Sequence, residues 1–248
     1  DLKWGFGWMD NTLRYMKVDP LERKSYHNLL TFNPIDLGRE RYMLPFSHDL
    51  VVHGKSPLVY KMNGAGEWQK FAGLRLVLGY MFSYPGKKLL FMGDEFADTA
   101  EWDYERSLNW HLLQFPPHQG MQTLVKDLNH LYRRERPLYE FEFGHEGFKW
   151  IDVNDWANST IAYERWSSDS DLIIVAANFS PFARVSYRIG VEEFRYFREI
   201  MNTDAPQYGG SGITLPKDLH SDKVPLHGRP YSLKFTLPPL AAVMLKRA

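Results

Sequence analysis

Side chains that can take part in acid–base or hydrogen-bonding chemistry follow two short apolar runs in the first half of the chain. The run Tyr42–Phe46 ends in Ser47-His48-Asp49, and the run Lys88–Met92 ends in Gly93-Asp94-Glu95, with Trp102 in the loop beyond. Carboxylates act as acids, bases or nucleophiles, and aromatic rings offer apolar faces to sugar C–H groups. A lone carboxylate after a strand is also a common helix cap or ion-pair partner. Two such polar groups after neighbouring runs favour a shared cleft.

Other motifs in the sequence carry less chemistry. Gly54-Lys55-Ser56 is not a phosphate-binding loop, because Asp49 stands where that motif requires a glycine. His48 and His53 have no third ligand at a helical offset, so we expect no metal site and no cofactor. The chain contains no cysteine, which excludes disulfides, thiol catalysis and cysteine-ligated metals.

Composition excludes further classes of function. The 30 basic residues balance 30 acidic ones, whereas a protein that binds nucleic acid or a membrane surface needs a basic excess. The longest nearly apolar run, Leu74–Tyr84, contains Arg75 and is too short to span a bilayer. We therefore expect a soluble, cytoplasmic globular protein without a nucleic-acid or membrane partner. An aromatic content of 15% suits carbohydrate binding, and it also suits a large α/β core.

Helical patterns follow both polar groups. Apolar residues at spacings of three and four predict a helix over Phe71–Phe82, which Pro85-Gly86 ends. A second helix is predicted from Met121 to Arg136, closed by Pro137. The repeat of strand, polar tip and helix is typical of βα units in a parallel sheet. A possible third unit joins a strand at Leu2–Trp4 to a helix at Thr12–Val18.

Polar residues at the carboxyl ends of parallel strands are typical of active sites on α/β barrels. A closed barrel needs eight strands, so most of such a barrel lies outside this sequence. The chain opens with Asp1-Leu-Lys-Trp-Gly-Phe-Gly-Trp8, without an initiator methionine or a secretory signal. That opening is typical of a cut through a folded domain.

The second half predicts a different fold class. From Phe148 onward, short alternating segments separated by turn residues predict about a hundred residues of antiparallel β-sandwich. We therefore expect an α/β domain over residues 1–143 and an all-β domain over residues 144–248. The stretch Asp204–Gly228, rich in glycine and proline, is expected to be a long loop. The expected strands are Phe148–Val153, Thr160–Trp166, Leu172–Phe179, Val185–Ile189, Tyr231–Leu237 and Ala241–Lys246.

The wording of several segments resembles a known family. Leu44–Lys55 reads Leu-Pro-Phe-Ser-His-Asp-Leu-Val-Val-His-Gly-Lys and is closely similar to a segment of glycogen (1,4-α-glucan) branching enzymes, of the α-amylase superfamily. The resemblance runs from end to end and looks like the C-terminal part of such an enzyme. Further similar segments are Gly5–Met9, Trp68–Ala72, Pro85–Ala97, Ser107–Leu113, Glu199–Asp204 and Ser232–Leu240.

The resemblance implies the C-terminal portion of a (β/α)₈ barrel followed by the family's β-sandwich. It also implies a retaining transglycosylation, in which an α-1,4 linkage is cut and the segment is transferred to a C6 hydroxyl to form an α-1,6 branch. Superfamily members use a third carboxylate that binds hydroxyls of the distorted sugar. By motif position this is Asp49, and we expect His48, Glu95 and Trp102 to contact substrate.

The departures from the family pattern are equally specific. The nucleophile of the family lies in an Arg-x-Asp motif, which this chain lacks, so the nucleophile and the acid/base are expected upstream. Leu50 replaces a usual glutamate beside the site, which implies a change in neighbouring subsites or in acceptor choice. Asp94 replaces a more usual asparagine.

Two classes of function follow. The first is a branching enzyme whose α-1,4-glucan substrate is processed only when this chain is joined to its N-terminal part. The second is a non-catalytic α-glucan-binding or assembly module that uses the aromatic residues and the sandwich. A hydrolase or debranching enzyme of the same superfamily is a weaker third interpretation.

Overall fold

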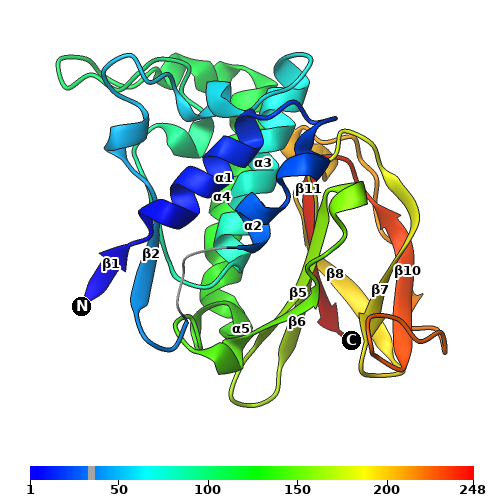
Figure 1. Cartoon of the computed structure of the whole chain (residues 1–248). Helices are drawn as coiled ribbons and strands as arrows, with labels where there is room; N and C mark the ends of the chain where they lie inside the picture. Colours follow the sequence, from blue (N-terminus) through cyan, green and yellow to red (C-terminus); the bar gives the residue numbers. More distant parts are fainter. Residues whose placement is uncertain (33–36) are drawn as a thin grey trace.

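The computed structural model describes residues 1–32 and 37–248, and it places a parallel sheet and its helices against two antiparallel sheets (Figure 1). No helix in these two ranges combines the length and apolarity needed to cross a membrane. The α-helices are α1 Phe6–Lys17, α2 Asn28–Thr31, α3 Glu67–Ser83, α4 Pro116–Arg134 and α5 Arg136–Tyr139. The strands are β1 Leu2–Trp4, β2 Arg41–Phe46, β3 Lys87–Leu90, β4 Phe148–Asp152, β5 Thr160–Trp166, β6 Leu172–Asn178, β7 Arg184–Val191, β8 Tyr196–Asn202, β9 Leu219–His220, β10 Tyr231–Leu237 and β11 Ala241–Arg247.

The first sheet is parallel, as the repeat of strand, polar tip and helix predicts. Its order is β1-β2-β3, and Met43 in β2 lies opposite Trp4 on one side and Lys87 on the other. Because all three strands point the same way, their carboxyl ends meet at one edge of the sheet. The polar residues that follow β2 and β3 are therefore neighbours.

Helix α3 is the centre of the molecule. Every residue from Phe71 to Ser83 is buried, because α3 contacts α4 on one side and β11 of the antiparallel sheet on another (Figure 1). A helix that is apolar on all faces requires such burial. The approach is close: a Cβ atom on Gly79 would lie 2.6 Å from Thr203 Cγ2 and 3.0 Å from Ala242 Cβ. The hydrophobic core is therefore continuous between the helices and the β half.

The second half contains two packed antiparallel sheets. One has six strands in the order β4-β5-β6-β11-β8-β9, and the other pairs β10 with β7. The six expected strands are present, with bounds shifted by at most two residues. Apolar residues between the sheets form a second core cluster, to which Ile174, Ile189, Leu233 and Val243 belong.

Two strands were missed by the sequence patterns. β8 pairs with β11 through a bulge, with Met244 opposite Met201 and Leu245 opposite Glu199, so the alternation of apolar and polar residues breaks in the middle of the strand. β9 has only two residues and lies within the stretch Asp204–Gly228 that was expected to be loop throughout. Period-two patterns do not detect either case.

Two helix starts were also wrong. α1 begins at Phe6 rather than Thr12, because the burial of Trp8 on the face that also buries Thr12 outweighs the low helix propensity of the flanking glycines. α4 begins at Pro116 rather than Met121, since proline is well suited to the first helical turn, and it ends at Arg134. Strand β3 ends at Leu90, two residues before the predicted Met92.

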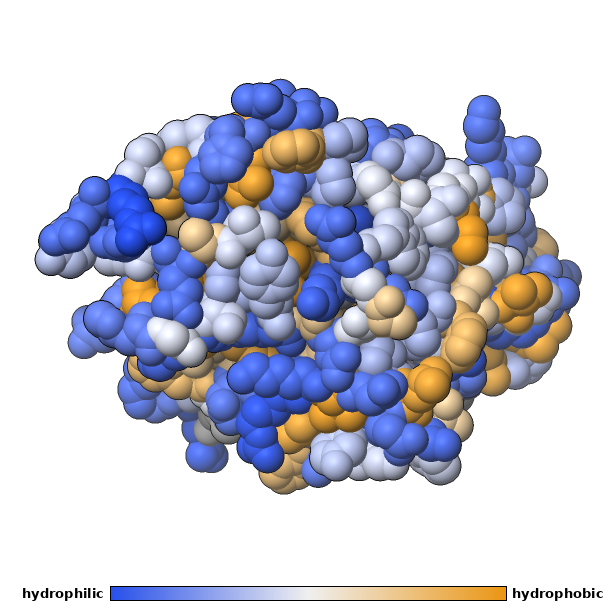
Figure 2. Space-filling view, turned by 90° about the horizontal axis from the view of Figure 1, so that it is seen from above, coloured by the Kyte–Doolittle hydropathy of each residue, from blue (hydrophilic) through white to orange (hydrophobic). Residues whose placement is uncertain are grey.

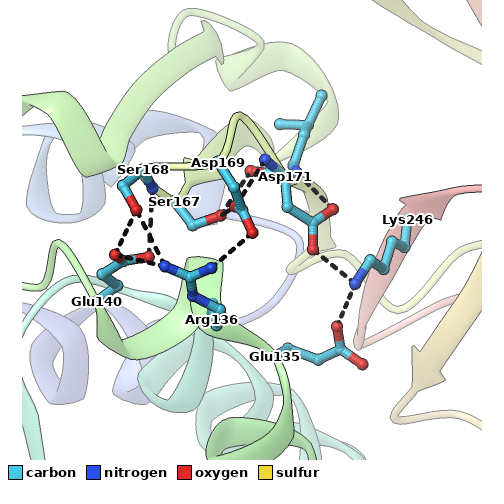
Figure 3. Close-up of polar contacts among 9 residues, drawn as sticks. Glu135, Arg136, Glu140, Ser167, Ser168, Asp169, Asp171 and Lys246 are labelled. Atoms are coloured by element: carbon cyan, nitrogen blue, oxygen red, sulfur yellow. Dashed lines mark hydrogen bonds and ion pairs between the residues drawn. The ribbon is translucent and has the colours of Figure 1, made fainter.

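Ion pairs and hydrogen bonds join the helical half to the β half at its lower end (Figure 3). Arg136 Nη1 lies 2.7 Å from Asp169 Oδ2, in the turn between β5 and β6, and Arg136 Nη2 lies 2.9 Å from Glu140 Oε1. Lys246 Nζ in β11 lies 2.7 Å from Glu135 Oε2 and 2.6 Å from an Asp171 oxygen. These contacts fix α5 against the β5–β6 turn.

Candidate active site

His48 and Asp49 lie where β2 ends. After Phe46 the chain takes one extended residue, Ser47, and then a single 3₁₀ turn over His48–Leu50. The side chains of His48 and Asp49 are 52% and 49% exposed, and His48 Nε2 lies 3.3 Å from Asp49 Oδ1. Within residues 1–32 and 37–248 the Asp49 carboxylate has no other ion-pair or hydrogen-bond partner. Both side chains are therefore free to contact a ligand, while Leu50 packs against the core.

The end of β3 brings Trp102 to the same place. Phe91 N donates to Phe46 O at 2.9 Å, which keeps the chain beside β2 one residue past the end of β3. The Phe91 ring lies 5.9 Å from the His48 ring and 5.4 Å from the Trp102 ring. Trp102 N also donates to Val51 O at 2.9 Å. His48, Asp49 and Trp102 are thus parts of one surface.

Glu95 has a local contact. Its Oε2 accepts a hydrogen bond from Gly93 N at 2.7 Å, and Gly93 has φ 95°, a left-handed conformation that favours glycine. The carboxylate is partly buried and stabilises the turn that follows β3. Of the four residues expected to contact substrate or to act on it, Glu95 is the one with an internal structural bond of this kind.

Asp94 is a buried acid beside Trp102. It lines a cavity of about 70 Å³ together with Trp102 and Asn109, and its Oδ2 has no hydrogen-bond partner in the described structure. Burial raises the pKa of Asp94 well above its usual range, the charge of Glu95 raises this pKa further, and nearby Lys61 opposes the shift. The folded protein therefore favours the neutral form of this side chain.

Replacing Asp94 with asparagine is expected to stabilise the protein at pH 7. A carboxyl with a raised folded pKa contributes most stability below its unfolded pKa near 3.8 and loses that contribution as the pH rises through the folded value. Asp94→Asn removes the buried charge, so its unfolding free energy at pH 7 should rise by about 1 kcal/mol or more. Urea denaturation from pH 4 to pH 8 measures this gain, which should vanish near pH 4. A gain that grows on acidification would contradict it.

Glu101 joins the two loops, and the sequence did not indicate this. Its carboxylate accepts hydrogen bonds from Gly54 N and Ser56 N, both at 2.8 Å, and these bonds hold its pKa below the usual range. Its partners are backbone amides distant in sequence, so no residue pattern identifies them. The Gly54–Ser56 segment, which resembles a phosphate loop only superficially, receives this carboxylate instead.

The described residues can bind and orient a ligand, but they do not form a pair of reacting carboxylates. Retaining glycosidases place two carboxyl groups about 5 Å apart across the scissile bond. Here Asp49 is free, Asp94 is buried and Glu95 is bonded to Gly93. Across the two described ranges no cluster of three histidine or acidic residues could hold a metal ion. Seen from the end where these loops lie, the surface mixes hydrophilic residues with separate hydrophobic patches (Figure 2).

Comparisons with known proteins agree with this picture. Residues 150–248 match the family model of the α-amylase C-terminal all-beta domain. Over 99% of its length the chain is 52% identical to a 1,4-alpha-glucan branching enzyme of Aquifex aeolicus, of which it covers 39%. It is 49% identical to one of Nitrosococcus oceani, again over 99% of its length, and covers 32% of that protein. The chain thus spans about a third to two fifths of these relatives.

A solved structure supports the fold. The chain aligns over 100% of its length, and 49% of the other chain, with the crystal structure of an α-amylase from H. orenii, at a TM-score of 0.58 and 12% sequence identity. At this identity the likeness shows the fold alone.

Proposed function

Because this chain is related over 99% of its length to 1,4-alpha-glucan branching enzymes and carries the all-beta C-terminal domain of α-amylases, it corresponds to a C-terminal portion of such an enzyme. We propose that the enzyme to which it belongs cuts α-1,4-glucosidic linkages and transfers the released chain to a C6 hydroxyl, forming α-1,6 branches in glycogen or starch. The identity along the whole chain is the observation that carries this proposal.

In this proposal, residues 1–143 are the last βα units of a (β/α)₈ barrel and residues 144–248 are the C-terminal β-sandwich. Two features support it: the three parallel strands with polar residues at one edge, and the likeness to an α-amylase fold. In the described sheet β1 pairs on one side only, with β2, so its other edge can receive the preceding strand of the barrel.

The proposed reaction divides its roles between two parts of the enzyme. A carboxylate of the preceding part attacks the anomeric carbon, while a second carboxylate protonates the leaving oxygen and later takes the proton of the acceptor hydroxyl. Asp49, exposed and unpaired except for His48, binds hydroxyls of the sugar at the reacting position. It acts most strongly in the oxocarbenium-like transition state, and His48 and Trp102 position the same sugar.

The partners in this proposal are an α-1,4-glucan chain and the N-terminal part of the same enzyme. No cofactor is needed for carboxylate-based transglycosylation, and the absence of cysteine suits the cytoplasmic location expected from the sequence.

An iodine-staining assay on amylose, with reducing ends counted in parallel, tests the proposal. The chain joined to its preceding part should remove the stain without new reducing ends, because transfer conserves their number. Residues 1–248 alone should do neither. New reducing ends in proportion to the loss of stain would indicate a hydrolase instead. Glucan binding by the joined protein without loss of stain would indicate the non-catalytic binding module.

A further inference from the structure

A cluster of aromatic side chains lies on the β half, away from the candidate active site. The His220 ring stands between two others: its centroid is 4.5 Å from that of Phe194 and 4.3 Å from that of Tyr196, with interplanar angles of 74° and 82°. The Tyr231 ring is 5.5 Å from Phe194. Phe194 is 49% exposed and Tyr196 is 54% exposed. We call Phe194, Tyr196, His220 and Tyr231 the aromatic platform.

Strand pairing holds the platform in place. Tyr196 in β8 lies directly opposite His220 in β9, and Phe194 stands two residues before Tyr196, the spacing that returns side chains to the same face of an extended chain. Tyr231 begins β10, and the adjoining Ser232 forms two backbone hydrogen bonds with Asp222, of 2.7 Å and 3.1 Å. The rings are thus presented by a fixed backbone, which lowers the entropic cost of binding.

The charges around the platform are largely neutralised within the protein. Arg195 pairs with Glu193 at 2.8 Å, and Arg188 pairs with Asp222 at 2.7 Å. Lys223 lies over the Phe194 ring at 5.1 Å.

The platform also offers unused hydrogen-bonding groups. His220 Nδ1 contacts Ser221 O at 2.7 Å, which leaves Nε2 for a ligand. The Tyr196 and Tyr231 hydroxyls have no hydrogen-bond partner in the part of the chain that is described. Ring faces edged by neutral hydrogen-bonding groups suit a ligand that is uncharged, hydroxylated and apolar on its C–H faces.

We propose that the aromatic platform binds a segment of α-1,4-glucan at a site separate from the one where bonds are cut. This inference rests on the proposed function for the identity of the sugar. A protein partner fits less well, because β9 has only two residues to offer for strand pairing and a stable protein interface buries about 800 Å² on each partner.

The position of the platform makes it an anchor for the polymer. Ala248 N donates to Tyr196 O at 3.1 Å, so the platform lies beside the C-terminus, at the end of the β half away from the loops that follow β2 and β3 (Figure 1). A glucan chain held there is not the stretch that contacts Asp49. Binding at the platform therefore raises the local concentration of other branches of the same polymer near the cleft.

The test is the affinity of the intact enzyme for glycogen, measured by the retardation of its migration in gels that contain increasing amounts of glycogen. The double variant Phe194→Ala/Tyr196→Ala should bind about tenfold more weakly, since each lost stacking contact is worth roughly threefold or more. Tyr196→Phe keeps the ring and should retain most of the affinity. Phe182→Ala, which removes an aromatic ring that is 59% exposed outside the platform, is the matched control and should bind as the parent does.

The outcomes separate this inference from the proposed function. Branching activity together with unchanged glycogen affinity in the double variant overturns the platform and leaves the function standing. Absent branching with weakened glycogen binding does the reverse. Self-association that is lost in the double variant, at unchanged glycogen affinity, would assign the surface to a protein contact instead. If the double variant unfolds, the single variant Tyr196→Ala, at a half-exposed position, gives the same comparison.

Discussion

Asp49→Asn is expected to lower the kcat of branching about a hundredfold to a thousandfold, the range seen when one preorganised stabilising group is removed from a transition state. The expected loss is in kcat rather than KM, because the carboxylate interacts most strongly with the charge that develops on the distorted sugar. Asparagine keeps the shape of the side chain and removes only its charge. Initial rates with saturating amylose, in the protein that includes the preceding part, measure the effect.

Stability should not change in the same variant. Asp49 is half-exposed and contacts only His48, so the unfolding free energy should stay within about 0.5 kcal/mol of the parent. Asp10→Asn is a suitable control, since Asp10 is 63% exposed on α1 and pairs with Arg14 at 3.7 Å. Activity of Asp49→Asn within threefold of this control would exclude the role assigned to Asp49.

The residues near Asp49 also show how far the sequence could predict the site. His48, Asp49 and Trp102 were identifiable because each follows an apolar run that had to be a strand, and parallel strands bring their carboxyl ends together. The burial of Asp94 and the bridge made by Glu101 were not identifiable. Both depend on backbone groups of loops far apart in sequence, which residue types and spacing do not encode.

The same distinction applies to the fold. Period-two and period-3.6 patterns located β5, β10 and α3, whose side chains face a uniform environment along their length. The bulge in β8 and the two-residue β9 are set by their neighbours in the sheet, so the local pattern was uninformative. The residues themselves indicated only a polar cleft on an α/β fold. The chemistry assigned to Asp49 came from the family resemblance.

Arg165→Met is expected to destabilise the protein by about 3 kcal/mol, lowering Tm by about 10 °C. Arg165 is completely buried where the two halves meet. Its guanidinium donates to three backbone carbonyls: Ser83 O at the end of α3 at 2.7 Å, Gly147 O at 3.0 Å and Leu138 O in α5 at 3.4 Å. Methionine fills much of the same volume but leaves these carbonyls without a donor, at about 1 kcal/mol or more each.

The cause of this loss is distinguishable from lost packing and from lost charge. Burial lowers the pKa of Arg165 only to about 10, so its charge is constant from pH 5 to pH 8 and the destabilisation should be independent of pH there. Arg165→Lys retains a donor that cannot span three carbonyls and should recover only part of the loss. Arg198→Met, an exposed arginine on β8, should stay within about 0.5 kcal/mol. Equal urea midpoints for the Arg165 and Arg198 methionine variants would mean that these carbonyls find other donors and that the junction rests on α3 packing alone.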